Sequence, residues 1–256
     1  MGAAMMRLIA LCLLLPMMGY CGSAIDFDGA DDFINIGDID AVNFGAGDWT
    51  YSVWVKRGSI NTDDMILGKD SGGSNRQIIL SIAPDNKVYI LYFKATGTVL
   101  QNTTATYTDI TSWHHIIALR RGNSFEIYID GISQSLGSLT GTHGTMQDVT
   151  SPLYIGGRVN PAAPFSGSID EVMIYNRALS VSEIKSIYAS RNASYPKSGI
   201  VCHWTMDNNG INTGQAHPNG STVKDSAGSN NGTISDGADG SMIIISSPTR
   251  KKRGRR

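Results

Sequence analysis

The sequence predicts an all-β protein, built as an antiparallel β-sandwich with one short helix. Short runs of alternating apolar and polar residues recur along the chain and are separated by Gly, Asn and Asp, a pattern typical of strands joined by turns. Of the acidic residues, 19 are Asp and only three are Glu, and Asp favours turns over helices. The chain has 256 residues, of which 41% are hydrophobic and 17% charged; this composition excludes a disordered protein and supplies a sizeable core.

The first 24 residues are typical of a secretory signal peptide. Arg7 precedes an apolar run at 8–18, and small residues follow at 22–24. We expect cleavage at Ala24 and export, so that the protein is secreted and lies outside the cell or on its surface. The run of about eleven residues is too short for a membrane-spanning helix, which needs about 20.

Cysteine usage follows from this assignment. Cys12 and Cys21 fall within the predicted signal, which leaves Cys202 as the one cysteine of the mature chain, without an intrachain disulfide. We expect Cys202 to be buried beside Trp204. Acylation of Cys21, as in a lipoprotein, is the less favoured alternative, because Tyr20 stands where that signal needs Gly, Ala or Ser.

The strands follow one another along the chain. In the segment 51–56, Tyr51, Val53 and Val55 share one face of a predicted strand. The segments 77–82 and 87–93 flank a Pro-Asp-Asn turn and predict a hairpin. Further strands are predicted at 31–37, 113–120, 125–130, 153–156 and 167–175.

One helix is predicted at about 181–190. Ser180 and Glu183 have the spacing of a capping box, in which each side chain bonds the backbone N–H of the other residue. Ile184, Ile187 and Tyr188 then follow at helical spacing, so we expect a short helix packed on the sandwich.

The segments 25–34, 49–56, 113–115, 125–131 and 167–180 resemble, in order and spacing, the laminin-G-like, concanavalin-A-like lectin/glucanase jelly-roll domains. The most specific block is 167–180, which reads GSIDEVMIYNRALS. The resemblance covers 25–190 and implies a jelly-roll sandwich. By itself it says little about function, because this fold carries lectins, glycosidases, adhesion modules and protein-binding modules.

The remainder of the chain departs from the family pattern. A strand with a Trp, followed by an Asp-Ser-x-Gly turn, often opens domains of this family, but here it stands near the end, at 200–207 and 225–234. We therefore predict an extension at 191–248. Its strand either completes the first sandwich, which we favour, or begins a second domain whose remainder is absent. Residues 249–256 form a basic tail, which we expect to be disordered.

Asp28 and Asp170 are the candidate metal ligands, with Asp31 and Asp32 nearby in the sequence. Jelly-rolls that resemble this one often hold a structural Ca²⁺ where the first and last strands meet. Hard cations of this kind take carboxylate and carbonyl oxygens. The alternative is that Asp28 and Asp32 only bond the backbone of their own turn.

The sequence gives little support for a histidine metal site or for a catalytic pair of Glu residues. His114 and His115 are adjacent in a predicted strand, so their side chains point to opposite faces and do not share a metal. The three Glu residues are 45 and 12 positions apart, whereas jelly-roll glycosidases carry two Glu on one strand. We expect a non-enzymatic protein, and a glycoside hydrolase is the less favoured alternative.

A binding module is the favoured function, with a glycan as ligand. Trp54, Tyr89, Tyr92 and Arg158 are the kinds of side chain that sugar sites use, although they are as common in cores and turns. The alternative is a protein-interaction or adhesion module, or a fragment of a larger surface protein, with an extracellular protein partner. The predicted mature body, 25–249, carries 14 cations against 22 anions, which disfavours nucleic acid. We expect a monomer.

Overall fold

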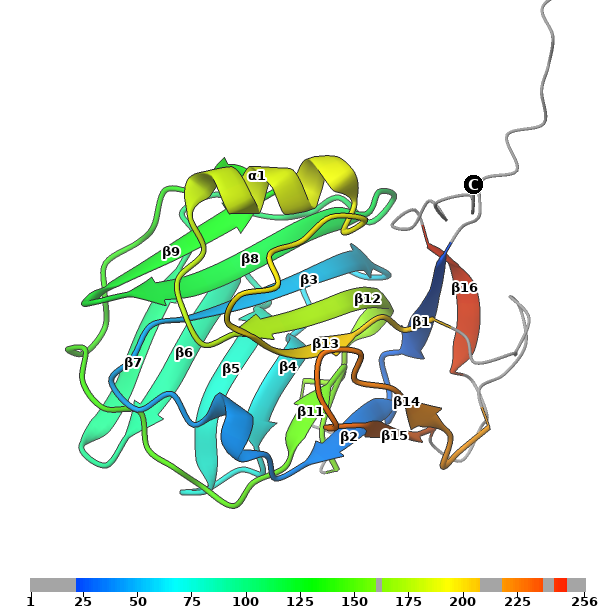
Figure 1. Ribbon diagram of the computed structural model, residues 1–256, viewed down its shortest axis with the longest axis horizontal. Coiled ribbons are helices and arrows are strands. Elements are labelled where there is room, and N and C mark those ends of the chain that lie inside the picture. The colour runs from blue at the N-terminus through cyan, green and yellow to red at the C-terminus, as the bar shows by residue number, and fades with distance from the viewer. Residues whose placement is uncertain (1–21, 160–162, 208–217, 237–241, 248–256) are drawn as a thin grey trace, which may run out of the picture.

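The structure is a computed structural model that describes residues 22–159, 163–207, 218–236 and 242–247. Two antiparallel sheets pack face to face as a sandwich, with one helix on the outside (Figure 1). The jelly-roll β-sandwich expected from the sequence is therefore confirmed. The predicted signal peptide, apart from residues 22–24, and the basic tail lie outside the described residues.

The first sheet has the strand order β10-β9-β8-β3-β12-β1-β16, and β13 pairs in addition with β12. Its long central strands, β3 and β12, pair over most of their length. The bounds are β10 (Ile132–Ser133), β9 (Ser124–Ile129), β8 (His114–Arg121), β3 (Trp49–Arg57), β12 (Ser166–Tyr175), β1 (Gly22–Asp28), β16 (Ile243–Ser247) and β13 (Ile200–Trp204).

The second sheet has the strand order β14-β15-β2-β11-β4-β5-β6-β7. Its hairpin β5–β6 is the one predicted from the sequence, with Ile82 opposite Val88 at the turn. The bounds are β14 (Thr222–Val223), β15 (Gly232–Ser235), β2 (Phe33–Gly37), β11 (Leu153–Ile155), β4 (Asp64–Asp70), β5 (Arg76–Ile82), β6 (Val88–Lys94) and β7 (Gly97–Asn102).

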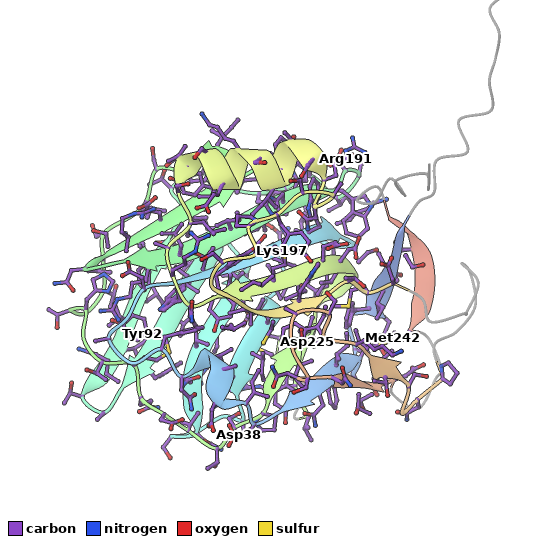
Figure 2. The ribbon with its side chains drawn as sticks, in the orientation of Figure 1. Asp38, Tyr92, Arg191, Lys197, Asp225 and Met242 are labelled. Carbon is purple, nitrogen blue, oxygen red and sulfur yellow. The ribbon has the colours of Figure 1, made fainter. Side chains whose placement is uncertain are left out.

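The main core lies between the two sheets and follows the two-residue alternation of the strands. Tyr51, Val53 and Val55 of β3 all point into it, as their spacing predicts. Tyr92 of β6 and Met242, which precedes β16, belong to the same core (Figure 2). A short 3-10 turn, η1 (Asp40–Val42), adds Val42 to it.

The predicted helix is present as α1 (Val181–Ser190), and its capping box is formed by Ser180 and Glu183. Ile184 and Ile187 pack it on the outer face of the first sheet, against Ile117 and other side chains of a separate apolar cluster. The helix therefore covers one outer face of the sandwich, as Figure 1 shows, whereas no helix of the described residues covers the outer face of the second sheet.

The region 191–248 contributes strands to both sheets. β13 pairs with β12, β15 pairs with β2 and β16 pairs with β1. Along β12, β1 occupies positions 166–169 and β13 occupies positions 172–175, so the two strands follow each other along the same edge. The strand that the sequence places late in the chain therefore lies in the sheet of the first sandwich.

Buried side chains fix this arrangement. Trp204 of β13 is fully buried in the main core, and the free Cys202 is buried beside it. Burial raises the pKa of the Cys202 thiol to about 12, so this cysteine is unreactive. Asp225, in the turn between β14 and β15, ties this turn to β13: its Oδ1 accepts hydrogen bonds from the backbone N–H groups of His203 and Ala227.

Within the described residues, no helix is long and apolar enough to cross a membrane.

Candidate functional site

The two predicted metal ligands do not meet. Asp28 ends β1 and lies opposite Ser166 of β12, whereas Asp170 is four positions further along β12. At about 3.3 Å per residue the two stand roughly 13 Å apart along the strand. Asp170 is also fully buried, and its Oδ1 accepts a hydrogen bond from the backbone N–H of Glu171.

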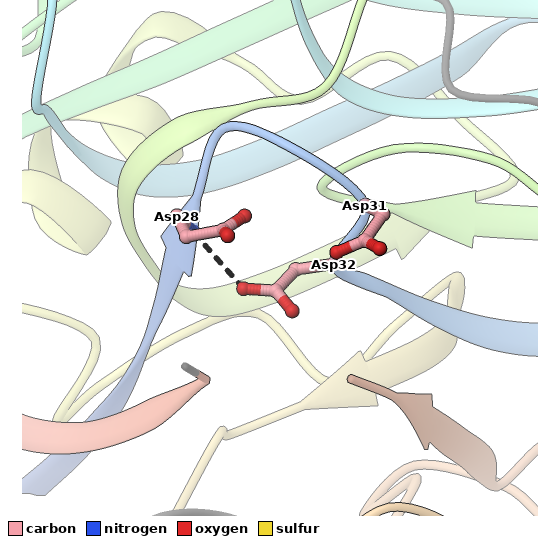
Figure 3. A group of neighbouring side chains, drawn as sticks. All are labelled: Asp28, Asp31 and Asp32. Carbon is pink, nitrogen blue, oxygen red and sulfur yellow. Dashed lines mark hydrogen bonds between the residues drawn. The ribbon is translucent and has the colours of Figure 1, made fainter. Parts of the chain in front are cut away.

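Asp28 lies instead with Asp31 and Asp32 in the turn between β1 and β2 (Figure 3). One ligand oxygen from each of these three residues lies within 4.8 Å of the others. The same carboxylates shape the turn: Asp32 Oδ2 accepts the N–H of Asp28 at 2.9 Å, and Asp28 Oδ1 accepts that of Ala30 at 2.7 Å. Three carboxylates so close together suit a hard cation such as Ca²⁺.

A groove lies on the outer face of the second sheet, across β4, β5 and β6. Along β6, Val88, Ile90 and Tyr92 point into the core, so Tyr89 and Leu91 point outward. These two half-buried side chains line a cavity of about 200 Å³ together with Ser81 of β5. The groove thus combines an aromatic ring and an aliphatic side chain with a hydroxyl group, the mixture typical of small-ligand sites.

Three charged residues form the polar wall of this groove. Asp70 is 1% exposed and accepts hydrogen bonds from Arg76 Nε at 3.0 Å and from Arg158 Nη1 at 2.6 Å. Arg76 also stacks over the ring of Phe93, with 4.6 Å between Cζ and the ring centroid. Arg158 Nε is buried and has no hydrogen-bond partner within the described residues. The wall is therefore built from two guanidinium groups that a single buried carboxylate holds in place.

Asp63 stands at the end of the groove and balances its charge. Burial and the neighbouring Asp64 raise the pKa of Asp63, while Arg158 acts in the opposite direction. By formal charge, the carboxylates of Asp63 and Asp70 offset the guanidinium groups of Arg76 and Arg158, so these four residues of the groove lining sum to zero.

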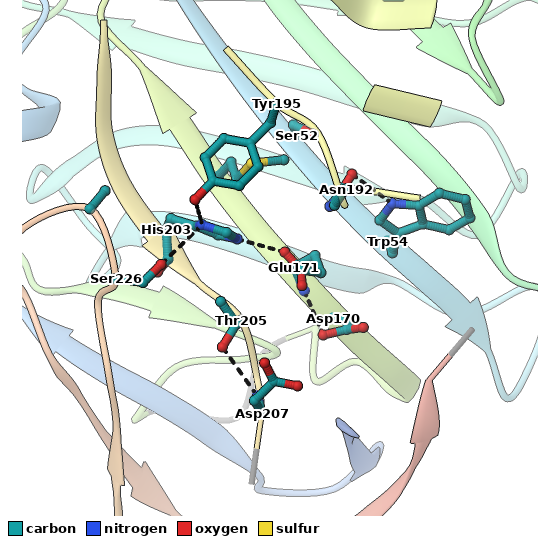
Figure 4. A network of polar contacts seen from close by, with 12 residues as sticks. Ser52, Trp54, Asp170, Glu171, Asn192, Tyr195, His203, Thr205, Asp207 and Ser226 are labelled. Carbon is teal, nitrogen blue, oxygen red and sulfur yellow. Dashed lines mark hydrogen bonds and ion pairs between the residues drawn. The ribbon is translucent and has the colours of Figure 1, made fainter. Parts of the chain in front are cut away.

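A second polar cluster is buried between β12 and β13 (Figure 4). His203 Nε2 lies 2.6 Å from Glu171 Oε2, and both side chains are almost fully inaccessible. The other ring nitrogen of His203 lies 3.0 Å from both Tyr195 Oη and Ser226 Oγ. Glu171 has a φ of 51°, which is the left-handed region, and it lies at an irregularity of β12 between Asp170 and Met173.

Ser226, His203 and Glu171 are the residue types of a nucleophile, a base and an acid. Ser226 Oγ, however, also donates to the backbone oxygen of His203 at 3.1 Å, and the imidazole is buried. The contacts join β13 to β12 and to the turn between β14 and β15. We therefore interpret this cluster as structural.

The three Glu residues are all held in protein contacts. Glu126 bonds Arg121 and Tyr128, Glu171 bonds His203, and Glu183 belongs to the capping box. Arg177 holds the pKa of Glu183 down to about 2. The three carboxylates thus lie in three different places and do not form a pair.

His114 and His115 lie on opposite faces of β8, as the sequence predicts. His114 bonds Asp130 and Asp109, and these carboxylates raise its pKa. His115 is buried against Trp54, and burial lowers its pKa to about 3. The two imidazoles therefore differ in charge at mildly acidic pH and do not converge on a metal.

The fold defines a class of protein, the antiparallel jelly-roll sandwiches. Residues 28–185 match the family model described as the concanavalin A-like lectin/glucanases superfamily. Because the match covers more than half of the chain, the chain belongs to this family.

Individual relatives are distant. Adhesion G-protein coupled receptor V1 of Danio rerio is 26% identical over 148 residues, which make up 55% of this chain and 2% of the receptor. Among solved structures, a candidate carbohydrate-binding protein from Bacteroides ovatus is similar with a TM-score of 0.64 at 16% identity, over 89% of this chain and 60% of that chain. A heptameric pentraxin from Limulus polyphemus is similar with a TM-score of 0.57 at 14% identity, over 89% of this chain and 96% of that chain. At these identities the structures establish the fold.

The sequence assigns no ligand-binding residue. Of the side-chain types that it offers for a sugar site, Tyr89 and Arg158 line the groove. Tyr92 is fully buried in the core and Trp54 lies under α1, outside the groove. Asp70 and Arg76 were missed, and the local signal that points to them is the acidic and basic pair that flanks the β4–β5 turn.

Proposed function

We propose that this chain is a non-catalytic binding module that holds an uncharged glycan in the groove across β4, β5 and β6. The observation that carries the proposal is the Arg76–Asp70–Arg158 cluster beside Tyr89. Guanidinium groups fixed by a buried carboxylate present N–H donors, which suit sugar hydroxyls, and the carboxylate of Asp63 offsets the remaining formal charge. The ring of Tyr89 offers a face for the C–H surface of a pyranose. Similarity to a candidate carbohydrate-binding protein supports the same ligand class.

Two properties go with this proposal. The signal-like segment 1–24 supports export and a location outside the cell or on its surface, where glycans are abundant. The acidic turn of Asp28, Asp31 and Asp32 supports a structural Ca²⁺. We propose that the module works as a monomer.

Affinity electrophoresis of the purified protein in gels that contain neutral polysaccharides tests the function. Retardation by at least one neutral polysaccharide is expected, and Arg158→Ala and Tyr89→Ala are each expected to weaken it about tenfold, or 1.4 kcal/mol. Arg121→Ala, which removes a cation paired with Glu126 far from the groove, serves as the matched control. Retardation that survives both groove variants would contradict the assignment of the site. Retention on no glycan would favour the protein-interaction or adhesion alternative.

Calcium is tested separately through stability. An ion that binds only the folded state raises the melting temperature, so 1 mM CaCl₂ is expected to stabilise the wild type and not Asp31→Ala. Asp40→Ala, another exposed acidic substitution, is the control. Equal responses of both variants would exclude the acidic turn as the binding site.

A further inference from the structure

A second cavity lies on the opposite side of the sandwich, at the end of α1. It has a volume of about 450 Å³ and is lined by Trp54, Ser112, Trp113, Tyr188, Ala189 and Arg191. Trp54 belongs to β3 of the first sheet and points away from the main core, whereas the groove lies on the outer face of the second sheet. The two cavities are therefore separated by the full thickness of the sandwich.

The aromatic floor of this cavity is rigid. Trp54 stacks on His115 with 5.1 Å between ring centroids and on Tyr188 with 5.8 Å, at interplanar angles of 24° and 17°. The indole N–H of Trp54 donates to Asn192 Oδ1 at 3.2 Å, and the Asn192 side chain is buried. His115 and Tyr188 also stack on each other, with 6.4 Å between ring centroids. The three stacked rings and the hydrogen bond therefore hold one another in place beneath the cavity.

The rim of the cavity is accessible and polar. Trp113 is half-buried, Tyr188 is 37% exposed, and Ser112 and Arg191 are exposed. Within the described residues, neither Trp113 Nε1 nor the Tyr188 hydroxyl makes a hydrogen bond. These groups are therefore available to a ligand that needs both an apolar face and hydrogen-bond partners.

The backbone of Arg191 is strained at this position. Arg191 ends α1 with a φ of 47°, and Asn192 follows with a φ of 61°. Glycine is the usual residue at such a helix end, because a side chain in the left-handed conformation costs about 1 kcal/mol. Strain of this kind is characteristic of functional positions, and here it puts a guanidinium group at the cavity.

We propose that this cavity is a second carbohydrate site, which binds a single pyranose ring between Trp113 and Tyr188. A pyranose has an apolar C–H face for the aromatic rings and hydroxyl groups for Arg191 and Ser112. A cationic ligand is disfavoured, because Arg191 lines the cavity and none of the six lining residues is acidic. The proposal shares its ligand class with the proposed function but uses none of the groove residues.

Two sites on opposite faces give the module a property that one groove lacks. A single monosaccharide unit cannot reach both sites, so each molecule would hold two separate sugar chains or two distant parts of one chain. Engagement of both sites on a dense glycan surface raises the apparent affinity by mass action alone.

Tryptophan fluorescence distinguishes the two sites. The groove contains no tryptophan, whereas Trp54 and Trp113 both line the second cavity, so a change in indole emission reports binding at that cavity. Trp113 is the more exposed of the two indoles. Titration of the full chain with methyl pyranosides of glucose, galactose and mannose is expected to shift the emission to shorter wavelength. Tyr188→Ala and Arg191→Gly are expected to weaken this response about fivefold or more; the glycine keeps the left-handed backbone that the helix end needs. Lys185→Ala, on the exposed side of α1, is the control.

The outcomes separate this inference from the proposed function. No spectral response to any of the sugars, or an equal response in Tyr188→Ala and the wild type, would overturn the second site. A polysaccharide retardation that Arg158→Ala abolishes would still support the groove in that case. A spectral response that persists in Arg158→Ala, with no retardation attributable to the groove, would support the second site alone.

Discussion

Glu171 and His203 form a hydrogen bond of 2.6 Å between Oε2 and Nε2 at the point where β12 exchanges one partner strand for the next. β1 pairs with β12 before this point and β13 pairs with it afterwards. The left-handed backbone of Glu171 allows its side chain to meet the imidazole beside β12. The contact therefore joins the late strand of the chain to the sheet.

Removal of the Glu171 carboxylate is expected to destabilise the protein strongly. Glu171→Ala removes the carboxylate that Nε2 of the buried His203 contacts, and such losses are worth about 3 kcal/mol or more. Urea unfolding measures the change as a lower midpoint at constant slope. Glu126→Ala breaks the more exposed pair with Arg121 and is expected to cost less than about 1 kcal/mol. Equal costs in the two variants would mean that the buried contact does not hold β13.

The neighbouring histidines of β8 are expected to give opposite pH dependences of stability. Burial lowers the pKa of His115 to about 3, so between pH 3 and 6.5 the unfolded state binds more protons. The titration of His115 therefore lowers the free energy of unfolding as pH falls below 6.5, by at most about 1.4 kcal/mol per pH unit. His114 has a raised pKa, so the stability that it adds is present below pH 6.5 and is lost as pH rises through the raised value.

Single substitutions separate the two effects. His115→Gln is expected to flatten the acid side of a plot of unfolding free energy against pH. His114→Gln is expected to remove the fall on the side above pH 6.5. Chemical denaturation at half-unit steps from pH 4 to 9 measures both. An unchanged acid slope in His115→Gln would show that the imidazole does not titrate as its burial requires.

The fold was largely predictable because its signals are local. Alternation in β3 placed Tyr51, Val53 and Val55 in the core, and the capping box of Ser180 and Glu183 marked the start of α1. Both features depend on residues within a few positions of each other. The structure agrees with them closely.

The candidate sites depend on register and on loops, and these were not predictable in the same way. The expected pairing of the first and last strands of the domain predicts that Asp28 and Asp170 share a metal ion. In the structure, however, the register between β1 and β12 places Asp28 opposite Ser166. The groove unites Asp70 from the end of β4 with Arg158 from the loop after β11, 88 positions away in sequence. No pattern among residues that are close in the sequence indicates that Asp70 and Arg158 are in contact. The contact between His203 and Glu171 is not indicated by the sequence for the same reason, because the two residues lie on different strands.

Trp204 tests whether the late strand is part of the sandwich core. The side chain is fully buried in the main cluster and its indole N–H donates to the backbone oxygen of Asn230 at 2.7 Å. Trp204→Ala is expected to lower the unfolding free energy by about 3–5 kcal/mol. Trp113→Ala, at a half-buried position outside that core, is expected to cost about 1 kcal/mol or less. A small effect at Trp204 would contradict a core position for β13.

The first residues of β1 give a last prediction, which bears on the expected cleavage at Ala24. Gly22, Ser23 and Ala24 pair with Ser247, Ser246 and Ile245 of β16, and Ala24 is fully buried. A chain that starts at Ile25 keeps only the pairs of Ile25 and Asp26 with β16. It is expected to be about 1–2 kcal/mol less stable than a chain that starts at Gly22, because buried ladder bonds are lost.

Thermal unfolding of the two purified chains measures the difference, which corresponds to a lower melting temperature of roughly 2–8 °C for a protein of this size. Mass spectrometry of the exported protein then identifies the natural first residue. A mature chain that begins at Ile25 would leave β16 held by two of its five pairs, and this strand should then exchange its amide protons faster than β12. Equal melting temperatures would show that the three pairs of Gly22, Ser23 and Ala24 with β16 add nothing to the stability of the sandwich, and cleavage at Ala24 would then carry no structural penalty.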